Sequence, residues 1–188
     1  MDPLIFNTKR LVVRKRKSTD WAEWRTYQLS HRSQANQFET EPLPLGRINQ
    51  ELFKRKLAFI REREAADHSY FRDAFSKESG QLIGSFSVLE LRRDIYQSAL
   101  LGWSIHHDFW GQGYGTELVQ AGIASAFKSL DLNSLEVYIQ PGNMRSIKLA
   151  KRVGLLPAGR RSEFLEIRGE LRDVRVFYLS KEQWNASF

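Results

Sequence analysis

The sequence predicts a single α/β domain with a mixed, mostly antiparallel sheet of about six to seven strands, flanked by about four helices. Segments 70–76, 82–91 and 99–106 follow one another as strands of a meander, which is typical of antiparallel pairing. The last of them and the later strand 134–139 each run through a turn into a helix, as in α/β proteins. With 188 residues the chain has the usual size of one domain, so we expect one unit over 1–188.

The first third of the chain predicts one strand and two helices. The strand covers 11–15, and a first helix begins near Asp20. The second helix covers 49–66, where apolar residues recur at helical spacing and charged residues lie between them. Segment 39–46 is punctuated by proline and glycine and forms the loop between the two helices.

The remaining elements complete the sheet and its second helical layer. Helix 116–129 has a wide apolar stripe, which indicates that it packs on the core. Asn143 is a natural N-cap for the next helix, and Gly154 followed by proline ends it. A closing hairpin pairs 161–168 with 172–179.

The turn before helix 116–129 carries the strongest functional signal. Gly111, Gly113 and Gly115 allow backbone N–H groups to approach an anion, and the helix that follows adds the positive end of its dipole. The turn lacks the lysine of a Walker loop, and its glycine spacing differs from the dinucleotide fingerprint. We therefore predict a diphosphate-binding turn, although the same pattern also suits a tight connection that binds nothing.

Together, this turn and the strand-turn-helix at 134–153 resemble the Gcn5-related N-acetyltransferase (GNAT) superfamily. The acetyl-CoA loop of that family has the form Gln/Arg-x-x-Gly-x-Gly/Ala, and the run from Trp110 to Gly115 occupies it. The tryptophan at the first position and the Asn143-x-x-Ser146 spacing are similar to the RimJ/RimL-like branch, which acetylates ribosomal proteins. The resemblance covers about residues 4–184, and it implies a V-shaped splay in the sheet.

The resemblance also implies which residues bind acetyl-CoA, the co-substrate of the family. The pantetheine arm is expected along 103–107, with a main-chain amide near Ile105 or His106 facing the thioester. No metal is expected, because the neighbouring His106 and His107 would point to opposite faces of a strand. The residues expected to bind the co-substrate are Trp103, Ile105, His106, Trp110, Gly111, Gln112, Gly113, Tyr114, Gly115, Thr116, Asn143 and Ser146.

Two residues are catalytic candidates. The resemblance implies that Ser146 protonates the leaving thiolate, and its alternative role is to cap the helix. Glu136 is a strand carboxylate at a position like that of the family, seven residues before Asn143, so the resemblance implies that it relays a proton through water; its alternatives are exposure to solvent or an ion pair. The chain departs from the family at Leu100, where a glutamate is frequent, and at Ala150, where some relatives carry a tyrosine.

The absence of the usual glutamate favours an acceptor amine that loses its proton easily. An α-amino group has a pKa of roughly 7.7–8.0, against about 10.4 for a lysine side chain. The chain contains no cysteine, so acyl transfer is expected to be direct. We therefore predict acetylation of the N-terminal α-amine of a protein, with a ribosomal protein suggested by the resemblance. A small amine (an antibiotic, polyamine or amino acid) and an inactive CoA- or RNA-binding module remain the alternatives.

The net charge of +7 and the basic run 14–17 raise the question of nucleic-acid binding. Alternate side chains of a strand face opposite ways, so this run need not form a continuous phosphate-binding track. We expect contact with nucleic acid at most through surface charge. No segment is long and apolar enough to span a membrane and no leader is evident, so we expect a cytoplasmic protein with no membrane partner, as a monomer or homodimer.

Overall fold

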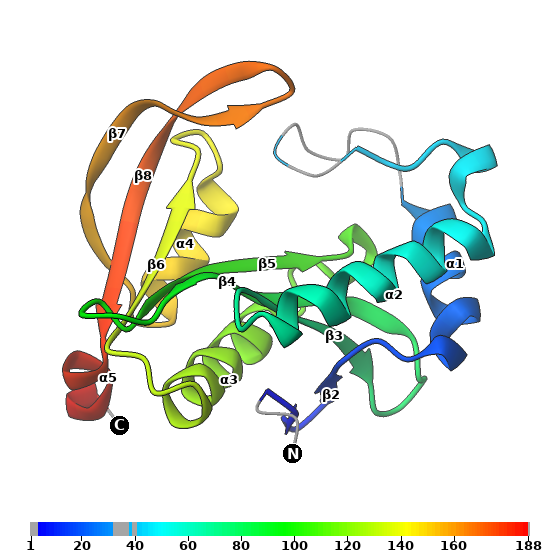
Figure 1. Ribbon diagram of the computed structural model, residues 1–188, viewed down its shortest axis with the longest axis horizontal. Helices are drawn as coiled ribbons and strands as arrows, with labels where there is room; N and C mark the ends of the chain where they lie inside the picture. The colour runs from blue at the N-terminus through cyan, green and yellow to red at the C-terminus, as the bar shows by residue number, and fades with distance from the viewer. Residues whose placement is uncertain (1–3, 32–37, 39–40, 188) are drawn as a thin grey trace.

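The computed structural model describes residues 4–31, 38 and 41–187, and within them one eight-stranded sheet organises the fold (Figure 1). The strand order is β1-β2-β3-β4-β5-β6-β8-β7, and β5 with β6 is the one parallel pair among these neighbours. The strands are β1 (Phe6–Asn7), β2 (Leu11–Arg14), β3 (Tyr70–Ser76), β4 (Leu82–Arg92), β5 (Ser98–Ile105), β6 (Ser134–Ile139), β7 (Leu156–Ile167) and β8 (Glu170–Ser180).

Helices cover both faces of this sheet. They are α1 (Trp21–Ser30), α2 (Gln50–Ala65), α3 (Tyr114–Ser129), α4 (Met144–Arg152) and α5 (Lys181–Ser187). The larger apolar core packs α3 and α4 against the sheet, and a smaller one packs α1 and α2. Neighbouring residues of β3 divide between the two, since Ala74 belongs to the larger core and Phe75 to the smaller. The two helical layers therefore lie on opposite faces.

The parallel pairing of β5 and β6 is short. Ser98, Ala99 and Leu100 lie opposite Ser134, Leu135 and Glu136, and the register ends there. Figure 1 shows the remainder of β6 rising away from β5. The sheet is thus open in a V between the ends of these two strands.

The fold class predicted from the sequence is confirmed, with a few differences at its margins. The short elements β1 and α5 were not predicted, because two residues of strand and a seven-residue helix carry too little periodicity. The closing hairpin is longer than expected, since β7 begins at Leu156 rather than 161. Its turn is formed by Arg168 and Gly169, both at positive φ (57° and 77°), as a tight two-residue turn requires.

Strand β7 lies at the edge of the sheet and is exposed along nearly its whole length. Its register with β8 shifts twice, between Pro157 and Gly159 and again between Arg161 and Leu165. In the second shift the amide of Glu163 donates to the carboxylate of Asp173 (3.0 Å). The irregularity therefore keeps a hydrogen-bond partner in place of the ladder.

The closest approach between α3 and the sheet is at Gly122. A Cβ atom at this position would lie 2.6 Å from the ring of Phe86 on β4, too near for any side chain. Both residues are buried in the larger core. Glycine at 122 thus sets how closely α3, which begins at the glycine turn, approaches the sheet.

We expect Gly122→Ala to lower the free energy of unfolding by about 1–3 kcal/mol, because the added methyl displaces Phe86 or the helix. Gly46→Ala is the matched control, since a Cβ at 46 has nothing within 4 Å. Urea denaturation of both variants measures the effect. A gain in stability for Gly122→Ala, of the size that alanine gives over glycine in a free helix, about 1 kcal/mol, would contradict the close packing.

Candidate active site

A cleft of about 790 Å³ runs along the end of β5, at Trp103 to Ile105, beyond the last residue that pairs with β6. One end lies at the glycine turn and α4, and the other at α1 and the loop that precedes α2. At the first end it is lined by Gly111, Gly113, Gly115, Thr116, Asn143, Arg145, Ser146, Lys148 and Arg152, at the middle by Trp103, Ser104, Ile105 and Trp110, and at the second by Arg16, Trp24, Tyr27, His31, Phe38, Glu41, Lys56 and Asp73, among others.

The end of β5 points backbone groups into this cleft. The amide of His106 donates to the carbonyl of Ile83 (2.9 Å), which fixes the side of the strand that faces β4. Because an antiparallel ladder alternates, the amides of Trp103 and Ile105 face the other side, where β6 has parted. The carbonyl of Ile105 accepts from the indole Nε1 of Trp110 (2.7 Å). Trp110 thereby fastens the glycine turn to the strand.

The glycine turn presents the N-terminus of α3 to the cleft. The helix begins at Tyr114, two residues before the expected start, and Gly113 is its N-cap at φ +83°. A side chain is strained in that left-handed conformation. The first amides of α3 have no intrahelical acceptor, so the turn offers donors and a positive dipole end to an anion.

Three of the residues expected at the co-substrate site are not among those lining the cleft. The His106 ring is buried on the α1 side, where its Nε2 contacts the hydroxyl of Ser30 (3.1 Å). Gln112 donates from Nε2 to the carbonyl of Asp108, and the ring of Tyr114 lies under the Arg10 guanidinium, 4.0 Å away. The structure therefore brings neither the His106 amide, bound to Ile83, nor these three side chains to the cleft.

The expectation that His106 and His107 point to opposite faces is wrong. Strand β5 ends at Ile105, and His107 starts a 3-10 turn (His107–Phe109). The alternation of a strand therefore stops before the pair, and the two rings lie side by side with centroids 4.1 Å apart and an interplanar angle of 31°.

Glu117 anchors the glycine turn from the first turn of α3. Its carboxylate accepts from the hydroxyl of Thr8 (2.5 Å), from the amide of Arg10 (2.7 Å) and from Arg10 Nε (2.7 Å). Arg10 also donates to the carbonyl of Gln112 (3.0 Å). Burial raises the pKa of Glu117, but the hydrogen bonds from Thr8 and Arg10 outweigh it and leave the pKa below its ordinary value.

Asn143 and Ser146 lie together at the start of α4. The side-chain oxygen of Asn143 accepts from the amide of Ser146 (3.2 Å), so Asn143 caps the helix as expected. In this pair Ser146 gives its backbone amide to the cap, and the residue also lines the cleft. Its hydroxyl remains the candidate proton donor.

Three cations on α4 were missed by the sequence reasoning. Arg145, Lys148 and Arg152 all line the cleft, and their spacing of three and four residues places them on one face of the helix. Arg145 stacks on the ring of Trp110, with 3.8 Å from its guanidinium carbon to the ring centre. Arg152 donates to the hydroxyl of Thr116 (3.4 Å). That spacing on a helix led by Asn143 was the signal that could have identified them.

Glu136 does not line the cleft. It lies at the base of the V, where its carboxylate accepts a hydrogen bond from the hydroxyl of Tyr138 (2.9 Å). The hydroxyl oxygen of Tyr138 in turn accepts from Arg161 (3.3 Å). Burial, and then the hydrogen bond to Glu136, raise the pKa of Tyr138 above its ordinary value. A route from Glu136 to the cleft therefore needs water.

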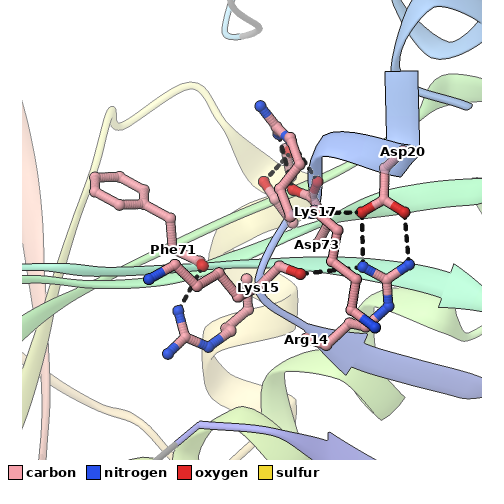
Figure 2. Close-up of polar contacts among 10 residues, drawn as sticks. Arg14, Lys15, Lys17, Asp20, Phe71 and Asp73 are labelled. Carbon is pink, nitrogen blue, oxygen red and sulfur yellow. Dashed lines mark hydrogen bonds and ion pairs between the residues drawn. The ribbon is translucent and has the colours of Figure 1, made fainter. Parts of the chain in front are cut away.

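Arg14, Lys15 and Arg16 of the basic run near the N-terminus are paired within the fold. Figure 2 shows Arg14 reaching Asp20 through two hydrogen bonds of 2.6 and 2.8 Å. Arg16 makes a similar bidentate pair with Asp73 (2.6 and 2.9 Å), and Lys15 pairs with Glu64 on α2. These side chains are thus used inside the protein and do not form a phosphate-binding track.

Among the described residues, the helices are too short or too polar to cross a bilayer.

Comparison with known proteins identifies the family. The model of the acetyltransferase (GNAT) domain matches residues 10–156, more than half of the chain. The N-acetyltransferase p20 of Bacillus licheniformis, itself uncharacterized, is 31% identical over 57% of this chain and 60% of its own length. The [ribosomal protein uS5]-alanine N-acetyltransferase of Escherichia coli is 24% identical over 69% of this chain and 66% of its own.

Among solved structures, Mycobacterium smegmatis RimJ in complex with CoA-disulfide superposes with a TM-score of 0.83 at 18% identity, over 95% of this chain and 88% of that one. At this identity the likeness shows a shared fold.

We expect Glu117→Gln to lower the free energy of unfolding by about 1–2 kcal/mol at pH 7, because a charged acceptor of three hydrogen bonds is lost. The folded pKa is depressed, so this stabilisation is complete above the ordinary value of 4.5 and disappears as the pH falls through the lower folded value. Urea unfolding at pH 7 and pH 3 measures the difference between wild type and variant.

Glu78→Gln, at an exposed turn residue, is the matched control and should change little at either pH. A difference between wild type and Glu117→Gln that stays the same at pH 3 would show that the carboxylate charge does not hold the turn.

Proposed function

The chain belongs to the GNAT acetyltransferase family, and on this premise we propose that it transfers the acetyl group of acetyl-CoA directly to the N-terminal α-amine of a protein, with a ribosomal protein as the acceptor. The observation that carries the proposal is the continuous cleft, which joins the glycine turn to an aromatic end along the last residues of β5, where β6 no longer pairs with it. A donor and an acceptor entering from opposite ends would meet at Ile105.

The residues at the first end fit the acyl donor. When bound, acetyl-CoA supplies an acetyl group activated as a thioester. The amides of Gly111 to Gly115 and the α3 dipole suit its diphosphate, and Arg145, Lys148 and Arg152 bring three positive charges to the same end. A Cβ at Gly113 would be strained at φ +83° and would lie 3.5 Å from Arg10. This end therefore favours a long polyanionic ligand.

Acetyl transfer needs a hydrogen-bond donor for the thioester carbonyl, a proton for the leaving thiolate and an acceptor for the proton of the amine. In our proposal the outward amide of Ile105 donates to the thioester carbonyl, where negative charge develops, and the outward amide of Trp103 pairs with the pantetheine arm. Ser146 delivers a proton to the departing thiolate from the start of α4. The proton of the acceptor amine passes through water to Glu136, whose carboxylate is oriented by Tyr138. The sequence contains no cysteine, so a cysteine acyl-enzyme is not available and transfer is direct.

An N-terminal amine suits a site that lacks the glutamate frequent in the family, because such an amine loses its proton without a strong base. Leu100 lies beside Glu136 in the register, at the position where the family frequently carries a glutamate. The pKa of an α-amine is about 2.5 units below that of a lysine amine, so it is deprotonated more easily at neutral pH. Trp24, Tyr27 and Phe38 line the acceptor end, which supports binding of a peptide through its apolar side chains.

A small cationic amine, such as a polyamine, is the second candidate. The carboxylates of Glu41 and Asp73 line the acceptor end and would attract a cation. Each is paired, however, Asp73 with Arg16 and Glu41 with Arg168 (3.3 Å). This pairing reduces the negative field that a polyamine would need, so the peptide is the better fit.

We expect acetyl-CoA to bind in calorimetric titration and thiol to be released with Ala- or Ser-starting peptides of ribosomal-protein sequence. The same peptides with a blocked N-terminus are the control for lysine acetylation. Thiol release with spermidine or an aminoglycoside, and none with peptides, would replace the proposed acceptor. Absence of acetyl-CoA binding would refute the proposed activity altogether.

We expect Ser146→Ala to lower kcat by about 10- to 100-fold while the affinity for acetyl-CoA changes about twofold or less, because the hydroxyl acts on the leaving thiolate. Ser129→Ala, exposed at the end of α3, is the matched control. Steady-state kinetics and calorimetry on the same preparations separate the two effects. Equal losses in kcat and in affinity would make Ser146 a binding or capping residue.

A further inference from the structure

Two histidines with little-exposed side chains and one carboxylate lie together between the end of β5 and the glycine turn. His106, His107 and Asp108 each place a ligand atom within 4.8 Å of the other two. The Nε2 atom of His107 is 3.3 Å from Oδ1 of Asp108, and Nδ1 of His106 is 3.6 Å from Oδ2. Two nitrogen donors thus lie beside one carboxylate.

His107 is the member of this cluster that packing alone leaves unexplained. Its side chain is only 6% exposed, and among the described residues neither ring nitrogen has a hydrogen-bond partner. The contact with Asp108 lacks the geometry of a hydrogen bond, although the distance is short. A buried polar group without a partner costs free energy, which an ion bound at the ring nitrogen would recover.

His106 is oriented as metal-binding histidines are. Its Nδ1 accepts from the amide of Asp108 (3.3 Å), so the lone pair is on the side of the carboxylate. The proton is then on Nε2, which contacts the hydroxyl of Ser30 (3.1 Å). A hydrogen bond at the far ring nitrogen fixes the tautomer and the ring orientation of a ligating histidine. The long contact from the Asp108 amide is the one that a metal would displace.

The donor set selects the class of ion. Ligands about 2.0–2.2 Å from a tetrahedral zinc ion lie about 3.4 Å from one another. Each ring nitrogen has one oxygen of the Asp108 carboxylate near this distance, Oδ1 at 3.3 Å from His107 and Oδ2 at 3.6 Å from His106. Imidazole nitrogens suit zinc and its transition-metal neighbours, whereas magnesium and calcium prefer oxygen ligands. The Asp108 side chain is 47% exposed, which leaves a route from solvent.

We propose that His106, His107 and Asp108 form a binding site for a divalent transition-metal ion of the zinc class, with water or the nearby His31 at the fourth position. The ring centre of His31 is 5.6 Å from that of His106 and 5.7 Å from that of His107. A bound ion would fix the 3-10 turn between the end of β5 and Trp110, and so the entry to the glycine turn. The proposal concerns stability of this turn and is independent of the acceptor.

The test is a titration of the metal-free, untagged chain with Zn²⁺, followed by calorimetry, and with Co²⁺, followed by visible absorption. We expect one Zn²⁺ ion per chain, the d–d bands of tetrahedral Co²⁺, and no heat with Mg²⁺. Absence of Zn²⁺ binding, or Mg²⁺ binding of equal strength, overturns the proposal.

Variants locate the ion. His107→Phe keeps an aromatic ring and Asp108→Asn keeps a half-exposed polar side chain, and each should weaken Zn²⁺ binding by about tenfold or more. His68→Ala is the matched control, because His68 lies before β3, where its Nδ1 contacts Ser69 (2.7 Å). Wild-type affinity in the two site variants, or an equal loss in His68→Ala, would assign the ion elsewhere. Because Asp108 is half-exposed, Asp108→Asn decides the question even where His107→Phe fails to fold.

Discussion

The parting of β5 from β6 after three paired residues is the constraint on which the rest of the molecule depends. If the ladder continued, the amides of Trp103 and Ile105 would be used by β6 and no cleft would exist. Leu149 packs against Gly115, where a Cβ would lie 3.3 Å from it, and so keeps α4 against the first turn of α3.

The glycine turn is held from several directions by segments far apart in the sequence. Trp110 binds back to the carbonyl of Ile105, Glu117 binds the β1–β2 turn through Arg10, and Arg145 covers Trp110. These contacts fix the backbone before any ligand arrives. A turn of this composition would otherwise lose conformational entropy on binding an anion, so its prior order favours affinity.

Local patterns sufficed for most of the fold and, at the candidate site, for the glycine turn and the cap of α4. The capping residues Asn49 and Asn143 and the left-handed Gly113 act through near neighbours, and the sequence shows such features directly. Side-chain pairs between elements far apart in the sequence could not be predicted from local patterns. Glu64 and Asp73, which pair with Lys15 and Arg16, lie about 50 residues or more away along the chain, and no local pattern indicates these pairs.

The positions of His106 and His107 could not be predicted for a different reason. Their positions follow from the exact residue at which β5 ends, and element boundaries are the least certain part of sequence reasoning. One residue more of strand would have separated the rings. Glu136 is a related case, since the carboxylate was visible in the sequence but its partner Tyr138 and its position off the cleft were not.

The exposed edge strand β7 affects whether copies of this protein associate. A regular outer strand of 12 residues would offer its free backbone groups to a second chain and invite aggregation. Here Pro157, the two register shifts and the charges of Arg160 and Arg161 interrupt that row of donors and acceptors. Self-association by strand addition is therefore disfavoured at this edge, and any contact between copies there has to rely on side chains.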